Sequence, residues 1–161
     1  MVFEKRPDSL QLHMFRLGIV SSVDEEKCTA KVYFEDRDDT VSYDLKIVVP
    51  QTMKNKFFWI PDIGETVICC FLQNGHETGF ILGSVYSEVD KPPFKDKKIK
   101  GIEFEDGTII KYDIKTSTLT IDCKNAVNII APSNVNVTGD VIADGISLKH
   151  HVHDGTGPPV G

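Results

Sequence analysis

The sequence predicts an all-β protein built from two β regions, and three observations support this prediction. Apolar and polar residues alternate with a period of two through residues 14–90, as they do in half-buried strands. A lysine-rich segment with two adjacent prolines interrupts this pattern at residues 91–100. From residue 101 to 148, apolar residues recur at a fixed spacing of eight, which is typical of stacked β architectures.

The first β region contains five strand-like segments separated by polar turns. These segments are residues 15–23, 28–36, 41–50, 65–73 and 78–86. An acidic turn at residues 24–26 separates the first two segments. The polar turn at residues 74–77 separates the last two and is typical of a hairpin. Short strands connected in this way predict a small barrel or sandwich.

A linker separates the two β regions. Proline lacks the backbone N–H that a β-ladder needs and favours extended backbone, so Pro92 and Pro93 are expected to end the first region. We therefore divide the chain into an N-terminal arm (1–13), a barrel (14–90), a linker (91–100), a repetitive β region (101–148) and a C-terminal tip (149–161).

The repetitive region carries two apolar series with a spacing of eight residues. One series is Leu119, Val127, Val135 and Ala143, and the other is Ile121, Ile129, Val137 and Gly145. Burying one such side chain contributes about 1.5 to 3 kcal/mol. Ordering the backbone of each residue costs about 1 to 2 kcal/mol, so an eight-residue rung gains little or nothing within one chain.

The same rung becomes favourable when identical faces from several chains close around a common axis. Three strands that face inward form a triangular prism with a dry interior, so the simplest closed solution is a homotrimer. A single-chain β-helix is the alternative, although it normally uses longer and more numerous coils.

Three of the five histidines, His150, His151 and His153, lie at the tip. If extended geometry continues beyond residue 148, His151 and His153 point to one face and His150 points to the other. Two imidazoles from each of three chains make six nitrogen donors, which suit octahedral Fe(II) or Ni(II) but not tetrahedral zinc. Such a site is closed and structural. Exposed histidines that bind nothing are the alternative, and His13 and His76 are assigned to the surface.

Composition and motifs argue against several other classes of protein. The net charge of −6 argues against a nucleic-acid-binding protein. No stretch is apolar for long enough to predict a membrane span, and the first residues show no apolar signal core. The four cysteines, at positions 28, 69, 70 and 123, fit neither a disulfide framework nor a zinc knuckle.

We also predict that the protein is not an enzyme and has no small-molecule substrate. His153 is followed directly by Asp154, so the His-X-Asp spacing of non-haem iron oxygenases is missing. The chain contains no HExxH motif, nucleophile elbow or phosphate-binding loop.

Two stretches of the chain resemble the central spike, or baseplate assembly protein V, family of contractile phage tails and tailocins. The first is FFWIPDIGETVICCFLQNGHETGFILGSVYSEVDKPP, residues 57–93. The residues that carry the match are Trp59, Pro61, Gly64, Val67, Gly79, Leu82, Gly83, Tyr86, Pro92 and Pro93. The second stretch is GISLKHHVHDG, in which Ser-Leu-Lys precedes a His-X-His motif that maps onto His151 and His153 but not onto His150.

This resemblance implies an OB-fold for residues 14–90, followed by a trimeric intertwined β-helix that narrows to a metal-bound apex. It implies one iron ion per trimer, held octahedrally by six histidines, His151 and His153 of each chain. It also implies a structural role: the spike caps the tail tube and is driven through the target cell envelope when the sheath contracts. The expected partners are the baseplate hub and tail tube proteins.

The expected location is the tip of the tail or baseplate of a phage or tailocin particle, assembled in the bacterial cytoplasm. The alternative function is an OB-fold module that binds a carbohydrate or a partner and is trimerised by its β-helix, because OB-folds elsewhere bind nucleic acids or sugars. The acidic composition argues against nucleic acid as a ligand.

Overall fold

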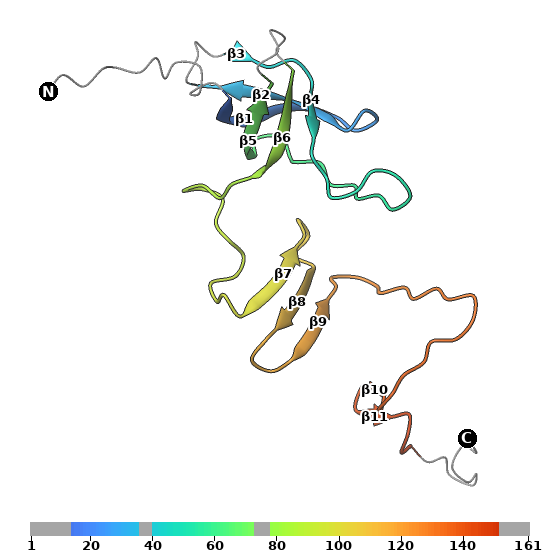
Figure 1. Cartoon of the computed structure of the whole chain (residues 1–161). Coiled ribbons are helices and arrows are strands. Elements are labelled where there is room, and N and C mark those ends of the chain that lie inside the picture. The colour runs from blue at the N-terminus through green and yellow to red at the C-terminus, as the bar shows by residue number, and fades with distance from the viewer. Residues whose placement is uncertain (1–13, 36–39, 73–77, 152–161) are drawn as a thin grey trace, which may run out of the picture. The chain divides into compact units, whose positions relative to one another are not determined.

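The computed structural model describes residues 14–35, 40–72 and 78–151, which contain strands and turns (Figure 1). The chain divides into two compact units, residues 1–95 and 96–161, and the boundary lies within the segment expected to be a linker. The described residues contain no helix, and thus none that is long and apolar enough to cross a membrane. The all-β prediction is confirmed.

The first unit is a closed five-stranded barrel with one short additional strand. Its strands are β1 (Phe15–Asp24), β2 (Thr29–Phe34), β3 (Thr40–Val41), β4 (Leu45–Ile47), β5 (Thr66–Phe71) and β6 (Gly79–Ser84). The strand order is β1-β5-β6-β4-β2, and β2 pairs back with β1 to close the barrel. Among the strand pairs of the described residues, only β4–β6 is parallel. A five-stranded barrel of this kind is consistent with the predicted OB-fold.

The barrel strands form where the two-residue alternation predicts them, with one difference. The segment at residues 41–50 forms two short strands, β3 and β4, instead of one. β5 and β6 pair antiparallel, as expected for a hairpin. The turn proposed at residues 74–77 lies outside the described residues.

The inward-facing positions of these strands form a single apolar core. The buried apolar residues are Val20, Ala30, Val32, Phe34, Leu45, Val67, Cys69 and Ile81. The Phe34 ring meets the Phe71 ring edge-on, with 5.8 Å between centroids. The guanidinium carbon of Arg16 lies 3.8 Å from the centroid of the Phe34 ring, which is a cation–π distance.

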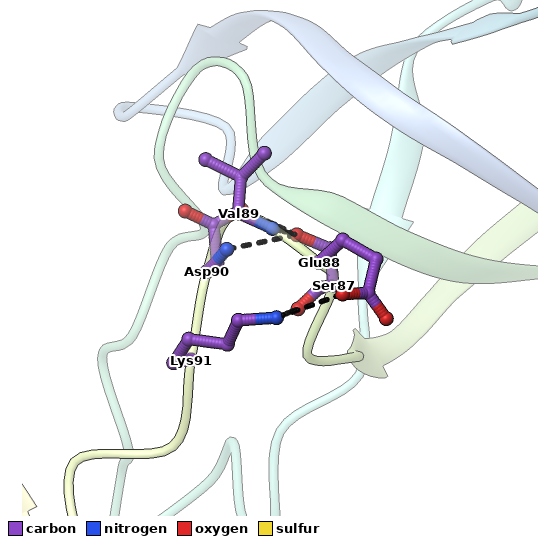
Figure 2. Close-up of polar contacts among 5 residues, drawn as sticks. All are labelled: Ser87, Glu88, Val89, Asp90 and Lys91. Atoms are coloured by element: carbon purple, nitrogen blue, oxygen red, sulfur yellow. Dashed lines mark hydrogen bonds and ion pairs between the residues drawn. The ribbon is translucent and has the colours of Figure 1, made fainter.

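A side-chain-stabilised turn follows β6, just before the two prolines (Figure 2). The Ser87 hydroxyl accepts hydrogen bonds from the backbone N–H groups of Val89 (3.2 Å) and Asp90 (2.9 Å). The Ser87 N–H donates to the Asp90 carbonyl at 3.1 Å. Lys91 and Glu88 form an ion pair across the turn at 3.1 Å. Serine side chains commonly satisfy backbone groups in this way, so the chain leaves the barrel in a defined conformation.

The second unit consists of an antiparallel sheet and a separate small hairpin. The sheet comprises β7 (Ile99–Glu103), β8 (Ile109–Asp113) and β9 (Thr118–Asp122), in that order. The hairpin comprises β10 (Ile142–Ala143) and β11 (Ile146–Ser147). Residues 123–141 form no strand, and none of the described residues from 96 to 151 is buried.

The stacked rungs predicted from the eight-residue repeat are not seen in the single chain. The first members of the two series, Leu119 and Ile121, belong to β9 of an antiparallel sheet. The members at Val127, Ile129 and Val135 have no strand partner within the described part of the chain. A rung that closes only around a three-fold axis finds no partner in one chain, so the β-helix and the trimer stay predictions.

Candidate metal site and apolar face of the second unit

The β10–β11 hairpin sets the position from which the histidine segment begins. Its two-residue loop is Asp144-Gly145, whose φ angles are 50° and 81°. Positive φ at both loop positions defines a type I′ turn, and Asp-Gly is one of the preferred dipeptides for it. Ala143 pairs with Ile146, and the Leu148 N–H donates to the Val141 carbonyl at 2.9 Å. The sequence therefore encodes a tight reversal at Asp144-Gly145, five positions before His150, the first histidine of the cluster.

The chain then forms a turn and does not continue as a strand. The Ser147 hydroxyl accepts a hydrogen bond from the His150 N–H, and the Ser147 carbonyl accepts one from the His151 N–H, both at 2.9 Å. The extended geometry assumed from the sequence therefore ends at Ser147, because these backbone N–H groups bond back to the preceding residue of β11. Strand alternation does not decide which faces His150 and His151 occupy.

The imidazole ring of His151 is oriented by a hydrogen bond to the backbone. Its Nδ1 lies 2.8 Å from the Leu148 carbonyl oxygen. A carbonyl oxygen only accepts, so Nδ1 carries the proton, and the lone pair of the neutral ring lies on Nε2. Metal-binding histidines almost always use the second ring nitrogen in such a bond, so His151 fits the role of a ligand through Nε2.

One chain by itself does not complete a metal site within the described residues. His153, the other predicted ligand, lies outside them, as do His13 and His76. No group of three or more His, Cys, Asp or Glu side chains in the described part of the chain is placed to hold an ion. The iron site therefore stays a prediction that needs residues from more than one chain.

The cysteines of the chain are all free thiols and occupy different environments. Cys69 is buried, whereas Cys28, Cys70 and Cys123 are partly exposed. Burial raises the pKa of the Cys69 thiol to about 11, and the positive charge of Arg16 opposes this only in part. Cys69 and Cys70 are neighbours in β5, so their side chains point to opposite faces, which agrees with this difference in burial.

One face of the β7–β8–β9 sheet is apolar and exposed. Ile102, Ile110 and Ile121 pair across the three strands, and so do Lys100, Tyr112 and Leu119. Paired residues of an antiparallel sheet share a face. We call Ile102, Ile110, Tyr112, Leu119 and Ile121 the apolar face.

The two faces of this sheet differ strongly in chemistry. The exposed fractions of the apolar face range from 37% for Ile110 to 64% for Leu119. The opposite face carries Gly101, Lys111 and Thr120 in the corresponding row. The opposite face is more mixed, because Ile99 and Ile109 also lie on it, and the apolar face stays exposed among the described residues of this unit.

The first unit has a separate apolar groove of about 370 Å³ beside β4 and β6. Phe57, Trp59 and Pro61 line it from the β4–β5 connection, and Ile81 and Gly83 line it from β6. Trp59 is 57% exposed, so its ring is available on the surface of the barrel.

Two residues that organise the histidine turn were not singled out from the sequence. Asp140 accepts a backbone hydrogen bond from Lys149, and Ser147 accepts one from His150. The type I′ dipeptide Asp144-Gly145 is the signal that would have identified them. A hairpin at this dipeptide brings residue 140 next to residues 147–149.

Two comparisons with known proteins found matches. Residues 16–86 match the family model described as the Type VI secretion system/phage-baseplate injector OB domain. The spike protein of Escherichia phage P2 is 28% identical over 89 residues, which are 55% of this chain and 42% of that protein. The match thus spans less than half of the relative's length. The barrel of this chain thus matches the phage-baseplate injector OB domain model, and the predicted resemblance to contractile-tail spike proteins is confirmed.

Proposed function

We propose that the protein is the central spike of a contractile tail or related injection particle. It caps the tail tube and is driven through the envelope of the target cell when the sheath contracts. The observation that carries this proposal is the pairing of an injector-family barrel with a second unit whose apolar face is exposed. The role is mechanical, and the protein is not an enzyme.

Three copies of the chain form the spike. None of the described residues of the second unit is buried in one chain, so that unit lacks a core of its own. Each apolar side chain that becomes fully buried contributes about 1.5 to 3 kcal/mol, and every copy contributes an identical set. Closure around a three-fold axis brings the three apolar faces together and continues along the eight-residue repeat.

His151 and His153 from each chain hold one iron ion at the apex. The bond from Nδ1 to the Leu148 carbonyl orients the His151 ring and leaves Nε2 as the coordinating atom. Bound iron supplies a six-coordinate crosslink with no open position for substrate. Chain ends at a tip are prone to fray, and a ligand bound only by the folded state stabilises that state.

The barrel attaches the spike to the particle. Its partners are the baseplate hub and the proteins of the tail tube, and its place is the tip of the tail. The match to a phage-baseplate injector domain supports this location. The exposed groove beside Trp59 is a surface of the barrel that such attachment can use.

Deleting the coding gene from a strain that produces the particle tests the function. We expect particles that lack the tip density in electron micrographs and that no longer depolarise target cells, although their sheaths contract. Complementation with the wild-type chain restores both properties. Particles that keep their tip and their killing activity after the deletion would refute the proposal.

Replacing the proposed ligands tests the metal site. The double variant His151→Ala/His153→Ala is expected to lose iron and to remain a folded trimer. The matched control, His150→Ala, keeps its iron, because that residue is not a proposed ligand. Iron retained at full occupancy in the double variant would show that the ligands are elsewhere.

A further inference from the structure

Asp140 lies outside the histidine cluster, but its carboxylate is hydrogen-bonded to the turn that carries the histidines. Oδ1 of Asp140 accepts a hydrogen bond from the Lys149 N–H at 3.1 Å, across nine residues of sequence. The pKa of Asp140 lies below its ordinary value, first because the Ser147 side chain donates a hydrogen bond to it. The backbone N–H groups of Lys149 and Val141 lower that pKa further, as does the nearby charge of His150.

Ser147, which interacts with Asp140, also accepts hydrogen bonds from the backbone of two histidines. The Ser147 hydroxyl, which donates to Asp140, accepts from the His150 N–H at 2.9 Å. The Ser147 carbonyl accepts from the His151 N–H at 2.9 Å. The Asp140 carboxylate is therefore hydrogen-bonded to Lys149 and interacts with Ser147, and Ser147 in turn bonds the backbone N–H groups of His150 and His151.

The β10–β11 hairpin is too short to fix this turn without further support. Each of its strands has two residues, and the pairs are Ile142 with Ser147 and Ala143 with Ile146. No described residue in this part of the chain is buried, so apolar packing within one chain does not order it. A two-stranded hairpin alone is marginally stable in water. The hydrogen bonds of Asp140 are thus a substantial part of what defines the conformation of residues 147–151.

We propose that Asp140 is a positioning residue for the tip: its carboxylate clasps Ser147 and Lys149 and so fixes the turn that presents the His151 ring. This inference rests on the proposed function of His151 as a metal ligand. Asp140 acts through Ser147 and does not touch the ring. Its removal leaves the proposed ligands in place and releases the turn that orients one of them.

Three variants and one control test the clasp. Asp140→Ala removes the acceptor, and Ser147→Ala removes the hydroxyl that transmits its effect. Asp140→Asn keeps a carbonyl acceptor and should rescue most of the loss. Asp106→Ala is the matched control, because Asp106 forms the same kind of clasp with the N–H (2.8 Å) and hydroxyl (3.0 Å) of Thr108, in the β7–β8 turn.

The first readout is Fe(II) affinity, measured anaerobically by competition with a chelator. Loss of an outer partner of a metal ligand typically weakens binding about 10- to 100-fold, and we expect this for Asp140→Ala and Ser147→Ala. Asp140→Asn should lie within about threefold of the wild-type protein by the same reasoning, and Asp106→Ala should be unchanged.

The second readout is amide hydrogen exchange in the metal-free protein, which reports on the turn and not on the ion. We expect exchange at the N–H groups of Lys149, His150 and His151 to be at least about tenfold faster in Asp140→Ala. Exchange within β8 serves as the internal reference and should not change.

The two readouts together decide the inference. It is overturned if Asp140→Ala and Ser147→Ala bind Fe(II) as the wild-type protein does, or if affinity falls while exchange at residues 149–151 stays the same. Faster exchange with unchanged affinity also overturns it. If the wild-type protein binds no Fe(II), or if His151→Ala binds it equally well, then His151 is not a metal ligand. In that case the proposed function of His151 is wrong, and the inference about Asp140, which rests on it, is wrong as well.

Discussion

Cys69 lies in the core of the barrel with Arg16 opposite it on the neighbouring strand. With a pKa of about 11, about one thiol in a thousand is ionised at pH 8, against about one in ten for a thiol at the reference value of 9.0. We therefore expect Cys69 to resist a thiol reagent at pH 8, while Cys28, Cys70 and Cys123 are labelled. Mass spectrometry of the labelled peptides measures this. Labelling of Cys69 as fast as that of Cys70 would show that the core opens readily.

Gly18 lies in β1, packed tightly against β2. A Cβ atom at this position would meet the Val32 side chain, the Tyr33 carbonyl oxygen at 2.6 Å and the Phe34 ring at 2.8 Å. Gly18→Ala should therefore destabilise the barrel by about 1 to 3 kcal/mol through overpacking. Leu17→Ala, on the exposed side of the same strand, is the control and should cost less. Chemical denaturation monitored by Trp59 fluorescence measures both, and equal effects would contradict the tight packing at Gly18.

His151 illustrates how far residue-level inference from the sequence extends. A Ser-Leu-Lys run before a His-X-His motif indicates the residue type and the candidate ligand. It does not indicate the bond between His151 Nδ1 and the Leu148 carbonyl, which depends on the turn after Ser147. Asp140 was missed for a different reason: the hairpin at Asp144-Gly145, which brings residue 140 beside its partners on the other arm, was not recognised in the sequence.

A substitution on the apolar face of the β7–β8–β9 sheet tests directly whether this sheet forms the interface between chains. Ile121→Asp places a charge on that face, and burying an unpaired charge is costly, so we expect the variant to dissociate into monomers. Thr120→Asp is the matched control, because the adjacent residue of β9 lies on the opposite face and the trimer should persist. Sedimentation velocity distinguishes the two. A trimeric Ile121→Asp variant would show that this face is not the interface.

Acid should weaken the turns of the second unit. The pKa of Asp96 is lowered by its hydrogen bond with Lys115, at 2.6 Å, and the pKa of Asp106 is lowered by its bonds with Thr108. A carboxyl with a depressed pKa in the folded state stabilises that state above the unfolded value of 3.8. That contribution is lost as the pH falls through the lower, folded-state pKa.

We therefore expect the amide groups of β8 and its flanking turns to keep constant protection against hydrogen exchange above about pH 5. Their protection should fall below about pH 4. The double variant Asp96→Asn/Asp106→Asn should show a smaller change over the same range. Equal acid sensitivity in the wild-type and variant proteins would assign the effect to other groups.

The barrel strands were predictable because each is half-buried within one chain. Inward and outward positions of β1, β2 and β5 alternate, and the core they form is complete without a partner. The repetitive region differs, because its described residues form no core within a single chain in which the apolar side chains could be buried. Its spacing of eight indicates that a stack is needed, but the first members of the series pair antiparallel in β9, and residues 123–141 form no strand. Local alternation therefore predicts the barrel well, whereas the described residues of the second unit bury no side chain within one chain, and the proposed trimer would supply the missing contacts.

The whole molecule joins a barrel that matches an injector family model to a second unit whose described residues, 96–151, form no buried core. We expect the stabilities of the two units to respond differently when the protein is diluted. The core of the barrel is complete within one chain, whereas the stability of the second unit should depend on the concentration of its copies if it assembles as proposed. Differential hydrogen exchange at two protein concentrations should show protection that rises with concentration from residue 99 onward, while the core of β1 and β2 stays constant. Concentration-independent protection of the second unit at all dilutions would contradict this dependence.

Three copies of the chain that share one iron ion form the arrangement on which the proposed spike depends. Native mass spectrometry combined with elemental analysis measures both numbers in one sample. We predict the mass of three chains of 18.0 kDa with one iron per three chains. A stable 18.0 kDa monomer without iron would contradict the proposed spike.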